Sequence, residues 1–477
     1  MRMRRLRHRM RRLAAEWELV ILLLLVVILF LLQVQYLSQA AFPISDEGVH
    51  ALVGRLLWEG QIPYRDFSYS HPLLLPHLLG LSQQFTPSML PPRLVYLFLN
   101  MSSAIPLFLF LRRLNGNGFA ALIATLFYVT YFQMVEHNFR FIAFRQATNV
   151  FLIWFLFVST LPRQDGRTLL IQTLLAIAGA LTMYQSAANL ALCALAVTAT
   201  HSGKERKELF LRYCAVGGCV VIALGVFLLV NPGSAQATLL DHGTRPVVDR
   251  LGRIAWTLNG DKTDLLLYAA SIPSLLLGAI FLKQIRSFCV AALGIIGLVF
   301  GPNEFFPHYF DIAGPAFAIG IFAGMSLLMS LVKGNLIALF AGFVLLAAHW
   351  IIVLPSLVQE WMNNRHPEYY GLIQTLSQQP EPLLTFFEPI YAVESGRRTV
   401  LQFELSDFRT FGSLLGKQLE PRQYLSLSSR ACTILLVPWD ASYIPQDVQD
   451  HWFRTYQQIV AAPWAAVLRT NNEGCDR

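Results

Sequence analysis

Long apolar runs separated by short polar segments constrain the fold of this chain more than any other feature. The first run, residues 17–36, has about twenty residues, which at about 1.5 Å per residue matches a hydrocarbon core of about 30 Å. Similar runs follow at residues 90–111, 118–135, 143–161, 168–184, 186–200, 211–230, 264–282, 287–301, 311–332 and 335–355. Because 55% of all residues are hydrophobic, the chain is predicted to be an all-α transmembrane bundle of about eleven spans.

The basic residues between these runs predict the topology. Seven of the first twelve residues are arginine, and a basic segment before an apolar run is also the pattern of a cleaved signal peptide. The first run is too long for that reading, and many spans follow it. Alternate loops collect basic residues, namely Arg112, Arg113, Arg163, Arg167, Lys204, Arg206, Lys207, Lys283, Arg286 and Lys333. Cytoplasmic loops are rich in Lys and Arg, so we expect a cytoplasmic N-terminus.

This topology divides the chain into a cytoplasmic basic tail (1–16), a transmembrane domain (17–355) with an external loop (41–72), and an external soluble segment (356–477). The formal net charge of +8 would favour a nucleic-acid partner in a soluble chain. Here the basic residues lie at one side of the membrane, so none is expected. The predicted external loops contain no Asn-X-Ser/Thr sequon, which favours a bacterial inner membrane.

The external loop after the first span concentrates charged residues and histidines. Asp46 and Glu47 precede a short helical pattern whose apolar residues recur every three or four positions, and Gly60 is placed to end it. The pattern predicts an amphipathic helix lying on the membrane surface with its apolar side against the lipid. Asp46 would cap the start of this helix, which by itself is a structural explanation for the acid.

This loop resembles the first external loop of the GT-C membrane glycosyltransferases, which include the protein mannosyltransferases and the lipid A aminoarabinose transferases. The matching residues are Asp46, Glu47, Gly60, Pro63, Tyr64, Asp66, Phe67, Pro72 and Leu73. The resemblance implies a GT-C-like fold, a membrane-embedded enzyme, and a sugar donor carried on polyprenyl phosphate. It leaves the acceptor open among lipid, glycan and protein, with membrane lipids as further partners.

The resemblance also assigns catalytic roles to residues of this loop. Asp46 would act as the general base that takes the proton of the acceptor, supported by Glu47, in a one-step inverting transfer. Asp46 could alternatively hold a divalent ion. Tyr64, Asp66 and His71 would contact the substrate, although many family members have Lys or Pro at the position of His71.

Further residues with implied or inferred roles follow other spans. Arg140 and Arg145 lie where the donor phosphate is expected, and a guanidinium suits phosphate oxygens; snorkelling to lipid head groups is the alternative. The family often has an acidic residue after this arginine, whereas this chain has Gln146, so Glu136 could replace it in contacting the substrate. His308 and Tyr309 begin a segment that resembles one common in the later spans of this family, which implies a role near the donor; a helix start with interfacial aromatic residues is the alternative.

A metal site is possible but has no diagnostic spacing, since no H-E-x-x-H motif occurs. Asp46, His50 and His137 could bind zinc or manganese, since carboxylate and imidazole suit these ions. A histidine at the interface that only forms hydrogen bonds is the alternative. A divalent metal cofactor is therefore left open.

From residue 356 the composition becomes less apolar and includes a short β-rich run, TILLVPW, bounded by polar segments. We expect a small external α/β domain here. Cys432 and Cys475 could pair if this segment faces an oxidising compartment. Arg397 and Arg398 could contact acceptor or donor, with a solvated turn as the alternative.

Two other functions compete with a glycosyltransferase. A lipid-linked sugar transporter or flippase would place ionisable residues within the spans, whereas here they gather in the external loops. A catalytically inactive GT-C-like assembly subunit is the second, and Gln146 is consistent with it. The sequence has no G-x-x-x-x-G-K-[ST] motif and no D-x-D triplet, which favours a lipid-linked donor over a nucleotide sugar.

Overall fold

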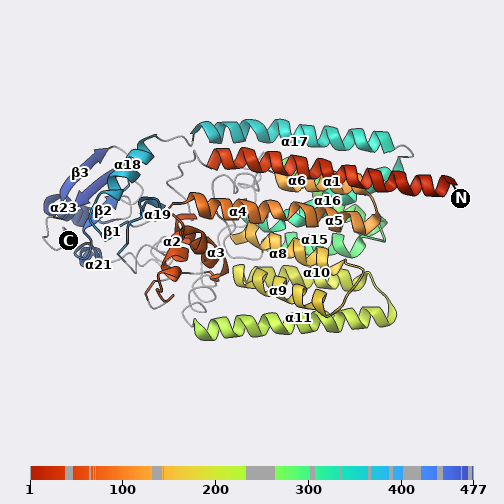
Figure 1. Ribbon diagram of the computed structural model, residues 1–477, viewed down its shortest axis with the longest axis horizontal. Helices are drawn as coiled ribbons and strands as arrows, with labels where there is room; N and C mark the ends of the chain where they lie inside the picture. The colour runs from red at the N-terminus through yellow and green to blue at the C-terminus, as the bar shows by residue number, and fades with distance from the viewer. Residues whose placement is uncertain are drawn as a thin grey trace.

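The computed structural model shows a long helical bundle with a small β-sheet at one end (Figure 1). The N-terminus lies at the far end of the bundle, and the C-terminus lies beside the sheet (Figure 1). The structure describes residues 2–37, 47–63, 66–67, 69, 71–86, 88–131, 142, 144–231, 264–300, 307–332, 335–363, 367–385, 390–400, 421–437, 444–462, 465–470 and 475.

Helices lie in all of the predicted apolar runs. The bundle contains α1 (Arg2–Leu37), α4 (Leu90–Ser102), α5 (Ala104–Asn115), α6 (Gly118–Thr130), α8 (Phe144–Ser159), α9 (Gly166–Thr182), α10 (Gln185–Ala199), α11 (Gly203–Val230), α14 (Leu265–Phe281), α15 (Arg286–Val299), the 3-10 helix η2 (Pro307–Ala313), α16 (Gly314–Leu331) and α17 (Asn335–Asn363). Within the described residues, five helical segments are long and apolar enough to cross a membrane. The total of about eleven spans stays a prediction, because the other apolar helices are shorter.

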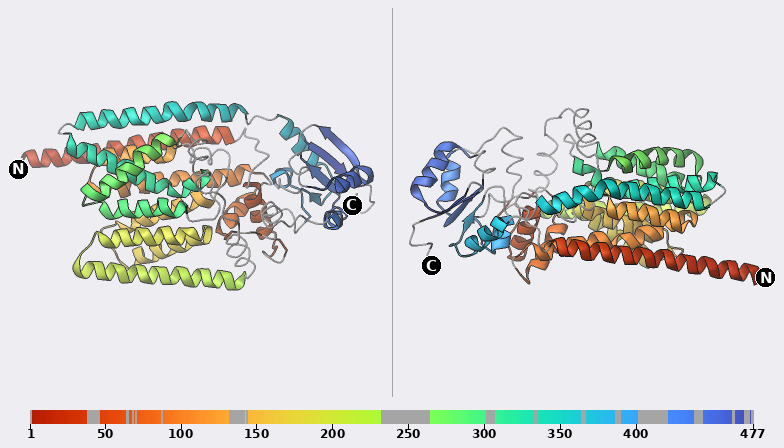
Figure 2. Two further views of the ribbon diagram at one scale, coloured as in Figure 1. Left: turned by 180° about the vertical axis from the view of Figure 1, so that it is seen from behind. Right: turned by 90° about the horizontal axis from the view of Figure 1, so that it is seen from above.

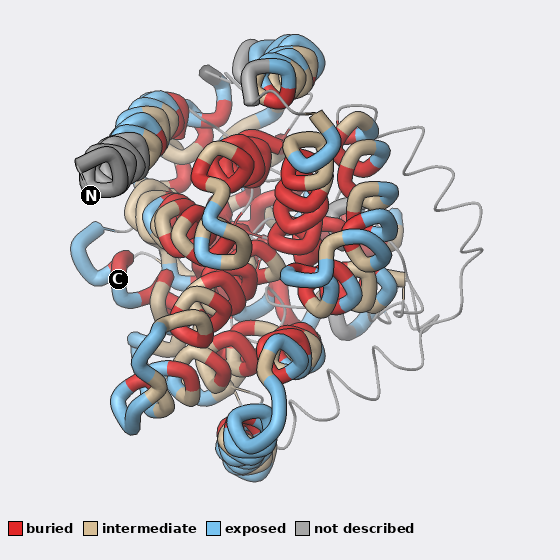
Figure 3. The backbone as a smooth tube through the Cα atoms, turned by 90° about the vertical axis from the view of Figure 1, so that its right-hand side faces the viewer, coloured by how far each residue is buried: buried red, intermediate tan, exposed pale blue. Residues whose placement is uncertain are grey.

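The outer helices expose apolar residues in the way that lipid contact requires. Only 17% of the apolar window is buried in Trp17–Leu37 and in Gly203–Val230, compared with 78% in Phe310–Leu331. Figure 3 shows the same contrast between a buried centre and exposed helices at the rim. Exposed side chains such as those of Leu24, Ile222 and Phe340 would be costly in water but are suited to hydrocarbon. The chain is therefore an integral membrane protein.

The C-terminal part forms a small mixed sheet with short helices (Figure 2). Its elements are α18 (Pro367–Ser377), β1 (Leu383–Leu384), α19 (Ile390–Ser395), α21 (Pro421–Ser428), β2 (Thr433–Leu436), α23 (Gln446–Thr455), β3 (Gln457–Ala462) and β4 (Ala465–Arg469). The strand order is β1-β2-β4-β3, in which β1 and β2 are parallel and the other pairs are antiparallel. β2 begins the predicted β-rich run. The location of this part outside the membrane stays a prediction.

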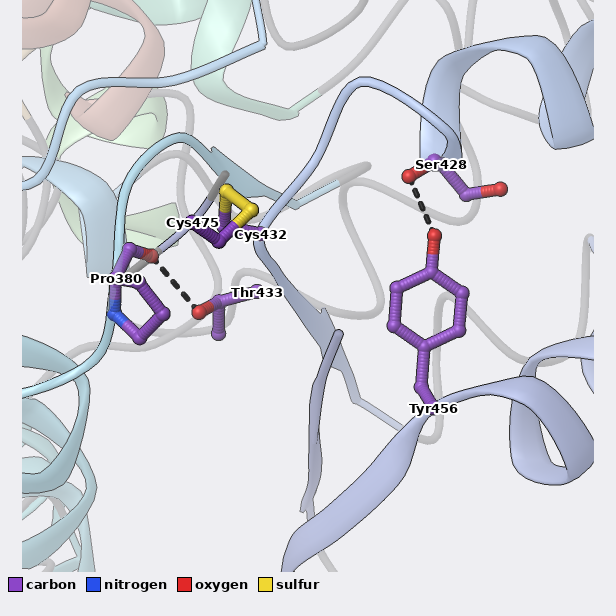
Figure 4. The surroundings of a disulfide bond; sticks show 6 residues. All are labelled: Pro380, Ser428, Cys432, Thr433, Tyr456 and Cys475. Carbon is purple, nitrogen blue, oxygen red and sulfur yellow. Dashed lines mark hydrogen bonds between the residues drawn. A yellow bond between two sulfur atoms is a disulfide. The ribbon is translucent and has the colours of Figure 1, made fainter. Parts of the chain in front are cut away.

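A disulfide joins the residue directly before β2 to a cysteine near the end of the chain (Figure 4). Cys432 and Cys475 are bonded, with a Cα–Cα distance of 5.6 Å and a sequence separation of 43 residues. Thr433, next in the chain, donates from its hydroxyl to the carbonyl of Pro380 at 2.9 Å. The bond thus fixes Cys475 beside the start of strand β2, and it forms the pair that the sequence allowed.

Two short helices lie between the bundle and the sheet, namely α2 (Glu47–Trp58) and α3 (Leu74–Gln83) (Figure 1). α2 is the predicted amphipathic helix, and Gly60 follows it with a φ of +83°, as a helix-ending glycine does. The prediction that its apolar side rests on lipid is wrong. Most of its residues are buried in protein, and the apolar ones share one core with α3, α19 and strands β2 and β4. Periodicity identifies an apolar face but not the material that covers it.

Candidate functional site

The start of α2 is fixed by a buried ion pair. Glu47, the first residue of the helix, is fully buried, and Arg93 of α4 is 4% exposed. The guanidinium donates from both Nε and Nη2 to the two carboxylate oxygens, with an Nε–Oε2 distance of 3.2 Å. Such a two-point contact sets the orientation as well as the distance. Asp46, the proposed base, directly precedes this anchor but lies outside the described residues.

A second carboxylate faces the same arginine. Glu394 of α19 interacts with Arg93 and accepts hydrogen bonds from the Met89 amide and the Ser88 side chain at the start of α4. Burial raises the pKa of Glu394 above its ordinary value, against the lowering effect of the arginine. Two acids and one arginine therefore join α2, α4 and the C-terminal part.

Arg55 makes a second connection between α2 and the C-terminal part. This arginine is 8% exposed and donates to the carbonyls of Ala392 at 3.2 Å and Arg397 at 2.7 Å. Glu381 pairs with two arginines: its Oε1 lies 3.7 Å from Nη1 of Arg397, and its Oε2 lies 2.6 Å from Nε of Arg398. The ESGRR segment is therefore tied to α2 and to Glu381 rather than being only a solvated turn.

An aromatic and imidazole cluster lies beside α2. The Tyr69 hydroxyl and His50 Nδ1 are 2.9 Å apart, with the donor set by the histidine tautomer. The ring centroid of His71 lies 4.0 Å from that of Phe144, at the start of α8, and His50 lies 5.4 Å from the same ring. The Arg145 guanidinium lies 5.1 Å from this ring centre. Phe144 thus brings three predicted site residues together: His50, His71 and Arg145.

Asp66 has a local structural role in the same loop. Its carboxylate accepts a hydrogen bond from the Ile62 amide at 2.8 Å, and its own amide donates to the Ile62 carbonyl at 2.9 Å. These bonds close the turn that brings Phe67 beside Pro63. Contact of Asp66 with substrate stays a prediction.

The 3-10 helix η2, which carries His308 and Tyr309, packs against α8. Asn149 of α8 donates to the carbonyl of Asp311 at 2.6 Å, one turn beyond Arg145. The backbone of the two predicted donor-binding residues therefore lies next to the helix that carries Arg145. Their side chains are not described.

Gln146, at the position where the family often has an acid, is buried within the bundle. Its side-chain carbonyl accepts a hydrogen bond from the Tyr96 hydroxyl at 2.9 Å and from the Asn100 amide at 3.4 Å. Both donors belong to α4, so Gln146 joins α8 to the helix that holds Glu47 through Arg93. These hydrogen bonds between α8 and α4 give a structural reason for an amide side chain at position 146.

Several predicted site residues lie outside the described residues: Asp46, Tyr64, Glu136, His137 and Arg140. Within the described part of the chain, no group of three His, Cys, Asp or Glu side chains is arranged to hold a metal. His50, the described member of the proposed metal set, has one ring nitrogen engaged by Tyr69. The metal hypothesis stays a prediction, since two of its three ligands are not described.

Sequence reasoning did not single out several residues of the site, among them Arg55, Arg93, Phe144 and Glu394. Arg93 and Glu47 are 46 positions apart, and Arg55 and Ala392 are 337 apart, so the sequence does not reveal these contacts. The ion pair of Arg55 with Glu59, at 3.5 Å, is the local exception. The one signal in the sequence was a charged residue within an apolar helical pattern, and Arg55 is that residue.

Solved structures share this fold. ArnT from Cupriavidus metallidurans bound to undecaprenyl phosphate matches with a TM-score of 0.68 and 15% identity over 95% of this chain and 98% of that chain. ArnT from the same organism in the apo state matches with a TM-score of 0.67 and 13% identity, again over 95% of this chain and 98% of that chain. The oligosaccharyltransferase of Archaeoglobus fulgidus in the apo form matches with a TM-score of 0.53 and 11% identity, over 93% of this chain and 73% of that chain. No family model and no curated protein sequence matches the chain.

These matches extend over nearly the whole of this chain. Identities this low establish a common architecture. The GT-C resemblance predicted from the Asp46 loop is thereby confirmed at the level of the fold, and the chain has the GT-C fold of ArnT and the archaeal oligosaccharyltransferase.

Proposed function

We propose that this protein transfers a sugar from a polyprenyl-phosphate donor to an acceptor at the external face of the membrane, with Asp46 as general base. The observation that carries the proposal is the match to ArnT, which covers nearly the full length of both chains and includes a structure with undecaprenyl phosphate bound. An oligosaccharyltransferase solved with dolichol phosphate and an inhibitory peptide has the same fold. Lipid phosphates are therefore the first ligands to test.

In the proposed reaction the acceptor oxygen attacks the anomeric carbon of the donor sugar. Asp46 takes the acceptor proton, the bond between the anomeric carbon and the phosphate oxygen breaks, and polyprenyl phosphate leaves. This single displacement inverts the anomeric configuration. Because the phosphate is a competent leaving group, the protein contributes mainly position and neutralisation of charge.

The described residues support this division of roles. Arg145 and His71 both lie against the Phe144 ring, and a guanidinium and an imidazole are groups that could bind a phosphate. The buried pair of Glu47 and Arg93 fixes the residue next to Asp46. A divalent ion, if bound, would be held by Asp46, His50 and His137 and would supply further neutralisation of charge.

Orientation in the membrane belongs to the same proposal. In Figure 1 the start of α1, the end of α5 and the start of α11 lie at the end of the bundle opposite the sheet. These helix ends carry or adjoin the basic segments, which favours a cytoplasmic location for that end. The disulfide of Cys432 and Cys475 favours an oxidising compartment for the other end, as a bacterial periplasm provides.

The test is a transfer assay with the purified protein in liposomes. Labelled undecaprenyl-phosphate sugars are mixed with membrane lipid extracts, and mass spectrometry identifies any product that gains the label. The proposal expects a new glycosidic bond of inverted configuration. A labelled lipid that only crosses the bilayer would identify a flippase, and no reaction with any donor would favour an inactive assembly subunit.

A further inference from the structure

We propose that Arg55 is a positioning residue that makes the geometry of the Asp46 site depend on residues 390–397 of the C-terminal part. This inference rests on the proposed function, because it concerns the placement of the proposed base. Arg55 does not reach the reacting atoms itself; it acts through α2, the helix that begins directly after Asp46.

The guanidinium of Arg55 recognises the end of helix α19. It donates to the carbonyl of Ala392, inside that helix, and to the carbonyl of Arg397, two residues beyond it. The carbonyl of Ala392 also accepts the backbone amide of Arg397 at 3.1 Å, so the guanidinium of Arg55 adds a second hydrogen bond to the turn that ends α19. Because the guanidinium is planar, its two hydrogen bonds fix the orientation of the Arg55 side chain relative to α19, whereas an apolar contact would not.

The other end of α2 also touches α19. Gly48, two residues after Asp46, packs so closely that a Cβ added there would lie 2.8 Å from the Cα of Ile390. The helix is therefore held by α19 at its first turn and again at Arg55, about two turns later. Because a short helix moves as a rigid rod, we expect a shift at Arg55 to reach Glu47, the first residue of α2, which follows Asp46 in the chain.

Helix α4 contacts both α2 and α19 through Arg93. Glu47 binds Arg93 of α4, and Glu394 of α19 faces the same arginine. α2, α4 and α19 are thus joined pairwise by charged contacts, with the proposed base directly before α2 in the chain. An acceptor that contacts the C-terminal part would act on the same three helices. The C-terminal part thereby helps to set the catalytic geometry, in addition to any role in binding.

The test compares three variants in the liposome assay: Arg55→Gln, Arg55→Lys and the control Arg454→Gln. Arg454 is an exposed arginine in the C-terminal part that donates to the Asp450 carbonyl of its own helix. We expect Arg55→Gln to lower kcat roughly 10- to 100-fold, because small displacements of a catalytic group cost this much. KM for the donor should change by less than about twofold, since ground-state binding is retained.

Arg55→Lys keeps the charge and should recover at least part of the lost kcat, while Arg454→Gln should behave as wild type. Hydrogen exchange of the 47–58 peptide should rise in Arg55→Gln and stay near wild type in the control. If Arg55→Gln does not fold, Arg55→Lys alone should still lower kcat and preserve KM. An unchanged kcat, or an effect confined to KM, would overturn the inference.

The outcome for Asp46→Asn separates this inference from the proposed function. If wild type transfers sugar and Asp46→Asn does not, while the Arg55 variants are fully active, the positioning role is wrong and the function stands. If Asp46→Asn is as active as wild type, the proposed base is wrong, and Arg55 has no base to position.

Discussion

Removing Arg93 should destabilise the protein strongly, because it leaves Glu47 charged and buried without its partner. At an Nε–Oε2 distance of 3.2 Å and an effective dielectric constant of about 20, the Coulomb attraction alone is about 5 kcal/mol. Desolvation of both groups offsets part of this, so the net value of the pair is smaller. Breaking a buried pair from one side nevertheless costs about 3–5 kcal/mol. We expect that loss of unfolding free energy for Arg93→Met, with α2 freed from α4.

The assay is reversible unfolding in mixed detergent micelles, followed by tryptophan fluorescence. The double variant Glu47→Leu with Arg93→Met should be less destabilised than the sum of the single variants, because the Glu47 carboxylate is removed together with its partner. The matched control is Glu208→Gln, which removes the exposed pair of Lys204 and Glu208 at 3.7 Å and should cost less than about 1 kcal/mol. A loss below about 1 kcal/mol for Arg93→Met would refute the anchoring role of the pair.

Three further predictions test other contacts. Gly80→Ala should cost about 1–3 kcal/mol in unfolding free energy, because a Cβ at Gly80 of α3 would collide with the carbonyl of Gly54 in α2. The same close crossing would put a Cβ at Gly54 2.9 Å from the Gly80 Cα. Cys432→Ser should lower stability by about 2–4 kcal/mol by opening the link to Cys475, and a reducing agent should have no further effect on this variant. The raised pKa of Glu394 means that the folded state binds its proton more tightly, so stability should rise as pH falls through the folded pKa toward 4.5; Glu394→Gln should flatten that dependence in unfolding measurements from pH 4 to 8.

The sequence was most informative where one local pattern determines the structure. The run at 17–36 became the apolar part of α1, and the periodic pattern after Glu47 became α2, because helix formation follows from local spacing and length. The first four residues of the run TILLVPW became β2 for the same reason. The Asp46 loop also predicted the fold itself, through its resemblance to GT-C enzymes.

The sequence was uninformative about what each face of α2 contacts. An amphipathic pattern is the same whether lipid or protein covers the apolar side, so lipid contact of that side was predicted wrongly. The partners of Arg55 and of Glu47 are backbone carbonyls and a side chain far along the chain, and carbonyls have no identity in a sequence. The cluster around Phe144 was missed because an aromatic residue in an apolar run is ordinarily a packing residue.

Single-turnover transfer by Asp46→Asn tests the central claim most directly. The amide preserves the size of the side chain but cannot take a proton, so the transfer rate should fall roughly 10²- to 10⁴-fold while donor binding is retained. Asp447→Asn, an exposed acid in α23, should match wild type in the same experiment. Transfer by Asp46→Asn at the wild-type rate would contradict the claim that this carboxylate is the base.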